Sequence, residues 1–134
     1  MILVSACLVG ACTRYDGGSR PSGHVLGLVP HKKLVPVCPE QLGGLSTPRP
    51  PAEITPGKDG FDVICGRAGV VTRDGQTDVT RAFLLGAREC VRIARLLGVE
   101  SCLLKSGSPS CGVSGITGVA AAMLVLADFQ VDEV

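Results

Sequence analysis

Residues 79–105, with the sequence VTRAFLLGARECVRIARLLGVESCLLK, predict the unit that decides the fold. The apolar side chains of Val79–Leu97 recur at spacings of three and four residues, with arginines on the opposite side, as in an amphipathic helix. Gly98 is placed to end this helix. The apolar run Val99–Lys105 follows directly and predicts a buried strand. A long helix that leads straight into a buried strand favours an α/β fold with parallel strands.

The same alternation continues along the rest of the chain. Strands are expected where short apolar runs occur: Ile2–Ala6, Leu34–Val37, Val99–Lys105 and Phe129–Val134. Helices are expected at Val79–Leu97, Ile116–Leu126 and, over a shorter length, His24–Pro30. Prolines predict an irregular loop over Gly43–Gly60, and Phe61–Cys65 with Gly69–Thr72 suggests a small two-stranded unit. We therefore expect a single three-layer α/β domain over residues 1–134, with a mainly parallel sheet of about four strands and helices on both faces.

Composition excludes several classes of function. A hydrophobic content of 46% is enough to form a buried core, and a chain of 134 residues is too short for two independent cores. A net charge of +1 without a basic run makes a nucleic-acid partner unlikely, and 3% aromatic residues cannot form a base-stacking platform. No apolar run is long enough to cross a membrane. The apolar N-terminus has no basic residue ahead of it, unlike a signal peptide, so a cytoplasmic protein is expected. In such a protein the odd number of cysteines, seven, argues against a disulfide framework.

The cysteines fall into groups by their place on this map. Three lie inside apolar segments and are expected to be buried core residues: Cys65, Cys90 and Cys102. Cys12 lies in a glycine-rich loop. The remaining three follow predicted strands: Cys7, Cys38 and Cys111. Because the carboxyl ends of parallel strands meet at one edge of a sheet, these three thiols are expected to converge on one site.

The spacing of the cysteines narrows the chemistry of such a site. A structural zinc site or a redox dithiol usually shows a pair with the spacing C-x2-C, and this sequence has none. Iron–sulfur clusters, in contrast, accept thiolates from widely separated loops. Three thiolate ligands on a four-iron cluster would leave one iron open to a substrate, as a Lewis acid.

Polar residues beside these cysteines are candidates for catalysis and binding. Glu40, two residues after Cys38, is a candidate general base for a water molecule, although a solvated carboxylate in a loop or a first helical turn has the same pattern. The hydroxyl groups of Ser108 and Ser110 are candidates for bonds to a substrate or to cluster sulfurs, and Ser110 is equally suited to cap a helix. Arg49 lies in the proline-rich loop, either in a lid over a substrate or in an ion pair with Glu53. Further candidates for contact with a substrate are Arg14, Tyr15 and Asp16.

Five short motifs occur together and in order: Ser5–Gly10, Arg14–Gly17, Pro36–Glu40, Thr47–Glu53 and Ser108–Gly112. On these motifs the chain, from residue 1 to about 115, resembles a small bacterial family of formerly unknown function that includes thiouracil desulfurases. The resemblance implies a [4Fe-4S] cluster held by Cys7, Cys38 and Cys111, with Glu40 and the serines of the last motif near the substrate. It also implies that a thiolated pyrimidine such as 2-thiouracil is converted to the oxo base without net redox chemistry, with release of sulfide.

The sequence departs from the family pattern after Cys111. Members usually continue with a segment that contains Gly, Tyr and Asp, whereas here Val113–Gly115 passes directly to Ile116–Gly118. This difference concerns the closing of the site over a substrate and leaves the ligand set unchanged. Longer members carry an extra domain and act on thiolated RNA bases, which favours a small-molecule thiolated base as the partner of this shorter chain.

Two alternatives stay open at the level of sequence. The first is a regulatory module that senses a cluster or metal, which would use four protein ligands, Cys12 among them, and would not need Glu40. The second is a structural fold in which all seven thiols are core or incidental, which would scatter the cysteines in space.

Overall fold

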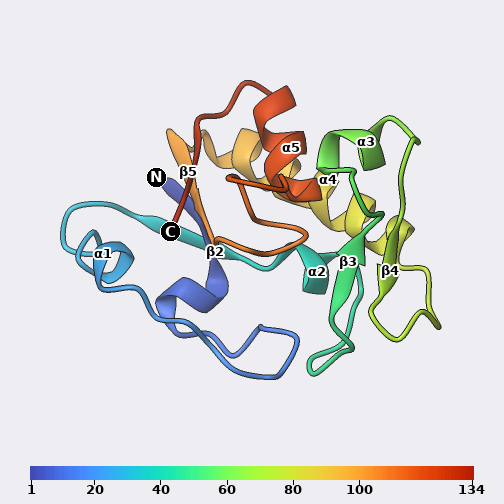
Figure 1. Ribbon diagram of the computed structural model, residues 1–134. Helices are drawn as coiled ribbons and strands as arrows, with labels where there is room; N and C mark the ends of the chain where they lie inside the picture. Colours follow the sequence, from blue (N-terminus) through green and yellow to red (C-terminus); the bar gives the residue numbers. More distant parts are fainter.

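A computed structural model describes residues 1–134, and its elements alternate as the sequence predicts (Figure 1). The strands are β1 Ile2–Ser5, β2 Leu34–Val37, β3 Ala52–Ile54, β4 Val70–Thr72, β5 Ser101–Leu104 and β6 Val131–Glu133. The helices are the 3-10 turn η1 Ala6–Val9, α1 Gly23–Leu26, α2 Pro39–Leu42, α3 Gly60–Ile64, α4 Thr80–Leu97 and α5 Val119–Leu126. None of the helices is both long and apolar enough to cross a membrane.

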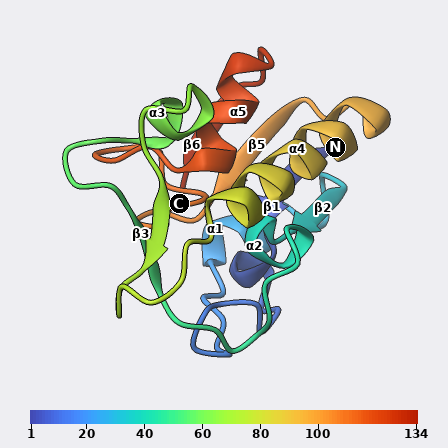
Figure 2. The same cartoon turned by 90° about the vertical axis from the view of Figure 1, so that its right-hand side faces the viewer.

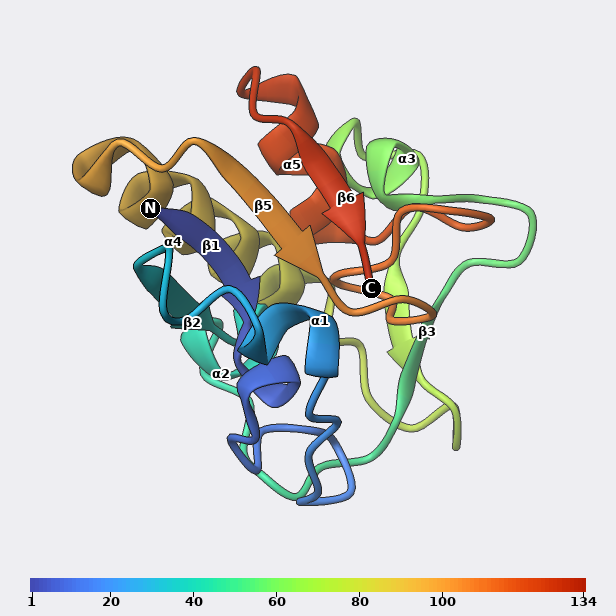
Figure 3. The same cartoon turned by 90° about the vertical axis from the view of Figure 1, so that its left-hand side faces the viewer.

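The central sheet has four strands in the order β2-β1-β5-β6, and every neighbouring pair is parallel. Ile2 lies opposite Leu34 on one side and Ser101 on the other. Figure 3 shows β1, β5 and β6 running in the same direction, with α4 and α5 on the far side. The prediction of a mainly parallel sheet of about four strands is confirmed.

Successive residues of β1 are buried on opposite faces of the sheet. Leu3 packs into the core that α4 and α5 form with the sheet, together with Ala94 and Leu124. Val4 points to the other face, where it packs with Val25 of α1. The strand is apolar in its first three residues because helices cover both faces of the sheet. This arrangement is the three-layer architecture that the sequence predicts.

Two glycines bring α2 into direct backbone contact with α4 (Figure 2). A Cβ atom on Gly86 of α4 would lie 1.8 Å from the carbonyl oxygen of Pro39, and one on Gly43 would lie 1.9 Å from the carbonyl oxygen of Ala82. Any side chain at Gly43 or Gly86 would therefore push the helices apart. The contact fixes the position of α2, which begins directly after Cys38 and carries Glu40.

The prediction of a two-stranded unit at Phe61–Cys65 and Gly69–Thr72 is half wrong. Residues 60–64 form α3, because Asp59 and Asp62 make a reciprocal capping box in which each carboxylate accepts the other's backbone N–H at 3.1 Å. The partner of β4 is instead β3, which lies inside the proline-rich segment predicted to be irregular. Ala52–Ile54 fits there because it is the short stretch between Pro51 and Pro56.

The remaining differences concern ends of elements and one cysteine. The short helix predicted at His24–Pro30 ends at Leu26, and the last helix begins at Val119 rather than Ile116. Cys65, predicted to be buried, is exposed, because it follows α3 as its C-terminal cap. Cys90 and Cys102 are fully buried in the core between the sheet and α4, as predicted.

Candidate functional site

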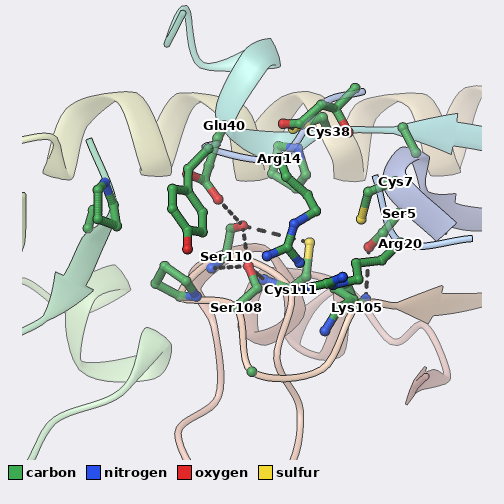
Figure 4. Close-up of a pocket in the computed structure, with 18 of the residues that line it drawn as sticks. Ser5, Cys7, Arg14, Arg20, Cys38, Glu40, Lys105, Ser108, Ser110 and Cys111 are labelled. Atoms are coloured by element: carbon green, nitrogen blue, oxygen red, sulfur yellow. Dashed lines mark hydrogen bonds between the residues drawn. The ribbon is translucent and has the colours of Figure 1, made fainter. Parts of the chain in front are cut away.

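A cavity of about 490 Å³ lies at the carboxyl ends of the central strands β1, β2 and β5 (Figure 4). Three thiols line it: Cys7, Cys38 and Cys111. Cys7 lies in η1 directly after β1, Cys38 lies between β2 and α2, and Cys111 lies in the loop between β5 and α5. The predicted convergence of these three cysteines is therefore present in the structure. Cys12, in contrast, is exposed and does not line the cavity.

The thiols surround a space and do not meet at one point. No three His, Cys, Asp or Glu side chains are arranged to hold a single metal ion. Cys38 Sγ lies 3.7 Å from the carbonyl oxygen of Thr13, to which it donates, and 3.9 Å from a guanidinium nitrogen of Arg49. A polynuclear cluster needs thiolates on different sides of a space, because each thiolate binds a different iron. The arrangement therefore fits a cluster better than a mononuclear metal site.

Burial disfavours the thiolate form of two of these cysteines. It raises the pKa of the Cys111 thiol to about 12, and it is also the main cause of the raised pKa of Cys7. Cys38, as a thiolate, would raise the pKa of each of these two thiols further. A cationic group in the cavity would stabilise the thiolates, so a bound metal cluster would displace their protons.

The loop that carries Cys111 is built around the start of α5. No side chain caps α5, and its first free N–H groups instead bind the loop: Val119 N donates to Pro109 O at 2.9 Å, and Ala120 N donates to Ser110 O at 2.9 Å. Gly118 permits this contact, because a Cβ atom there would lie 2.4 Å from the carbonyl carbon of Ser110.

A directed chain of hydrogen bonds connects this loop to Glu40. Ser108 Oγ accepts from the backbone N–H groups of Ser110 and Cys111, at 3.2 and 3.1 Å. Ser110 Oγ donates to Glu40 Oε2 at 2.9 Å. Since Ser110 has one hydroxyl proton, the 2.9 Å bond between the two serine hydroxyls has Ser108 as its donor. The Glu40 carboxylate is thus fixed at the wall of the cavity, as Figure 4 shows.

Arg49 fixes the other oxygen of this carboxylate. Its Nε donates to Glu40 Oε1 at 3.0 Å, and its side chain is only 5% exposed. The remaining N–H groups donate to Ser46 O, Thr47 Oγ1 and Thr13 O at 2.8–3.2 Å. The predicted alternative, an ion pair with Glu53, is wrong, because Glu53 pairs with Arg73 at 3.8 Å. With its donors bound to protein, Arg49 is suited to hold Glu40 rather than to bind a ligand.

Of the three candidates in the first loop, two line the cavity and one does not. Arg14 and half-exposed Tyr15 are lining residues, with the Arg14 guanidinium 5.6 Å from the centre of the Tyr15 ring. Asp16 is not among the residues that line the cavity, and its contact with a substrate stays a prediction. Its carboxylate accepts from Gly18 N at 2.9 Å and lies 3.6 Å from Arg14 Nε, so it shapes the loop.

Sequence reasoning missed six polar residues of the cavity: Ser5, Thr13, Arg20, Arg73, Lys105 and Ser106. Buried Ser5 Oγ accepts from Lys105 N at 2.9 Å, and the Ser5 hydroxyl lowers the pKa of the Cys111 thiol against the larger effect of burial. The position of Ser5, two residues before Cys7, could have identified it. Lys105 could have been identified because it ends the predicted strand Val99–Lys105, as Cys7 and Cys38 lie at the ends of theirs. Arg20 has no such signal, because it reaches the cavity through an irregular loop.

Cationic side chains outnumber anionic ones around the cavity. Five basic residues line it: Arg14, Arg20, Arg49, Arg73 and Lys105. Glu40 is the single lining carboxylate. Lys105 and Arg14 lower the pKa of Cys7 against the larger effect of burial, and the excess of positive charge favours an anionic group bound in the cavity.

Comparisons relate the whole chain to known proteins. A family model described as 2-thiouracil desulfurase matches residues 2–130. The chain is 43% identical over 143 residues to the uncharacterized protein YbbK of Bacillus subtilis (strain 168), an alignment that covers 98% of this chain and 93% of that protein. A solved structure of a [4Fe-4S]-dependent thiouracil desulfidase, TudS, superposes with a TM-score of 0.81 at 37% identity, covering 98% of this chain and 89% of that one.

Proposed function

The chain belongs to the 2-thiouracil desulfurase family, and we propose that it hydrolyses the C–S bond of a thiolated pyrimidine such as 2-thiouracil. Water supplies the oxygen, so the products are the oxo base and hydrogen sulfide, without net oxidation or reduction. One observation carries the proposal: three thiols from three separate segments line one cavity together with a carboxylate held in place by Arg49 and Ser110.

The three thiols are proposed to hold a [4Fe-4S] cluster. Cys7, Cys38 and Cys111 are soft ligands that suit iron–sulfur iron, and they face a space lined by excess positive charge. When bound, such a cluster supplies an open iron that acts as a Lewis acid toward the soft sulfur of a thiocarbonyl. Cys12 lies outside the cavity, so the geometry does not favour the alternative of a sensor with Cys12 as the fourth ligand.

Glu40 is proposed to be the general base. Its carboxylate would take a proton from the water molecule that attacks the ring carbon. Arg49 holds Oε1 and Ser110 holds Oε2, so the carboxylate has one orientation at the cavity wall. Each oxygen keeps a free lone pair after these bonds, which is what the base requires.

The other lining residues are proposed to orient the substrate or the base. Ser108 and Ser110 would hold Glu40 and offer hydroxyl groups to a substrate heteroatom. Arg14 and Tyr15 at the first loop would contact the planar ring. Arg49, with its N–H groups bound to protein, is proposed to be a positioning residue that acts through Glu40.

Residues 1–134 are proposed to form one desulfurase domain that works in the cytoplasm on a free base. All seven cysteines are free thiols in the structure, as a reducing compartment would maintain them. The net charge of +1 supports a small molecule rather than a nucleic acid as substrate.

The test is the reaction itself. Protein reconstituted with iron and sulfide without oxygen is mixed with 2-thiouracil, and uracil and sulfide are measured. Equimolar uracil and sulfide, formed over repeated turnovers without a reductant, is the expected result. A fully loaded protein that leaves every thiolated pyrimidine unchanged would contradict the proposal and favour a sensing role.

A further inference from the structure

The loop that carries Cys111 has a second attachment, in the segment between Cys111 and α5. Beyond Cys111 the chain turns through Val113 and Ser114 before it reaches α5. The backbone N–H groups of Val113 and Ser114 both donate to Glu133 Oε2, at 2.8 and 3.0 Å. The Ser114 hydroxyl donates to the other oxygen, Oε1. One carboxylate therefore binds three donors of two consecutive loop residues.

Glu133 lies on the sheet, in a position from which its side chain can attach the loop to the sheet. It belongs to β6, and it pairs with Leu104, the last residue of β5. The loop leaves the sheet just after this pair, and Ser106 N donates to Val134 O at 3.0 Å. The same edge of the sheet thus holds the loop at its start by backbone and beyond Cys111 by the Glu133 side chain.

The Glu133 carboxylate is committed to the loop by specific hydrogen bonds. Lys105, the basic residue nearest in sequence to the start of the loop, donates its Nζ to Ser106 O at 2.6 Å and makes no ion pair with Glu133. Both oxygens of the carboxylate are used by the loop. Two successive N–H groups on one anionic oxygen also form a charge-assisted contact, which is stronger than a bond to a neutral acceptor.

We propose that Glu133 is a positioning residue for Cys111: it ties the loop beyond this cysteine to the central sheet and so fixes the thiol in the cavity. The importance of that position for a cluster rests on the proposed function. The tether itself does not, because it is formed within the protein alone. Loss of the carboxylate would leave the loop attached through its own start, through α5 and through the bond from Thr117 Oγ1 to Val113 O at 3.2 Å, while the N–H groups of residues 113–114 lose their acceptor.

The experiment compares Glu133→Gln with Asp132→Asn in the cluster-free protein. Gln keeps the size of Glu but cannot accept all three bonds. Asp132 is the neighbouring residue on the same strand and accepts only from Gln130, at 2.9 Å, so it is a matched control. The rate of alkylation by iodoacetamide is measured at each cysteine by mass spectrometry, together with amide hydrogen exchange at residues 113–114.

Glu133→Gln is expected to raise the exchange rate of these amides and the alkylation rate of Cys111 about tenfold. This factor of about ten corresponds to the loss of one charge-assisted hydrogen bond. Alkylation of Cys90 and Cys102, buried in the core, should not change, and Asp132→Asn should behave as the wild type. Equal rates at Cys111 in all three proteins would overturn the proposal. Equal acceleration at Cys90 and Cys111 would also overturn it, since that pattern reports general loss of stability. Iron uptake is assayed separately, so a wild-type protein without a cluster would contradict the proposed function and leave this test intact.

Discussion

Replacement of Gly86 by Ala tests how strictly the backbone positions the base. The new Cβ atom would lie 1.8 Å from the carbonyl oxygen of Pro39, whereas ordinary contact begins at 3.4 Å. Helix α2 must therefore move by about 1.6 Å, and it carries Glu40 and begins directly after Cys38. A misplacement of about 1 Å can cost about 100-fold in rate. We expect kcat/KM for 2-thiouracil to fall by about that factor.

The effect of Gly86→Ala on stability should be small by comparison. Ala is a better helix former than Gly by about 1 kcal/mol, while overpacking costs about 1–3 kcal/mol. The free energy of unfolding should then fall by about 0–2 kcal/mol.

Kinetics of the reconstituted protein and urea unfolding measure these two effects. The control is Gly23→Ala, at a helical glycine whose added Cβ would meet no atom within 4 Å. A Gly86→Ala protein with the kcat/KM of the wild type would refute the reasoning.

Glu40→Gln should keep its iron, because no ligand is lost, while desulfuration falls by about 10²–10⁴-fold, the contribution of a positioned general base; full activity with full iron content would remove Glu40 from the mechanism. Arg49→Lys should lower kcat about tenfold or more with little change in KM, because Lys cannot bind Glu40, Thr13 and Thr47 at once; a rise in KM alone would instead indicate a contact with substrate. The hydrogen bond from Arg67 lowers the pKa of Asp62. The contribution of the Asp62 carboxylate to stability is therefore complete above the pKa of the unfolded carboxyl and is lost as the pH falls through the folded value. Asp62→Asn should therefore weaken the acid dependence of the melting temperature, and an unchanged dependence would count against this role.

The predictable part of the fold and site follows from strand ends. Cys7, Cys38 and Cys111 could be brought together from sequence because each follows an apolar run, and parallel strands end at one edge. The positions of these cysteines relative to the strands were sufficient to predict that they meet, without knowledge of the loops between them.

The unpredicted part depends on contacts between distant segments. The partners of Arg49 and of Glu133 are backbone groups and side chains brought near by loops, for which sequence spacing gives no rule. The role of Gly86 shows only when α2 lies against α4. Helix α3, in contrast, had a readable signal, the capping box of Asp59 and Asp62, which the apolar run at Val63 concealed.

The most direct test of the central claim is the iron and sulfide content of the oxygen-free, reconstituted wild type and of its single Cys→Ser variants. We expect about four iron and four sulfide per chain in the wild type and in Cys12→Ser. Loss of the cluster is expected in the variants of Cys7, Cys38 and Cys111, because a serine oxygen is a hard and poor ligand for this iron. A wild type that binds no iron, or a Cys12→Ser variant that loses the cluster while one of the other three retains it, would contradict the account.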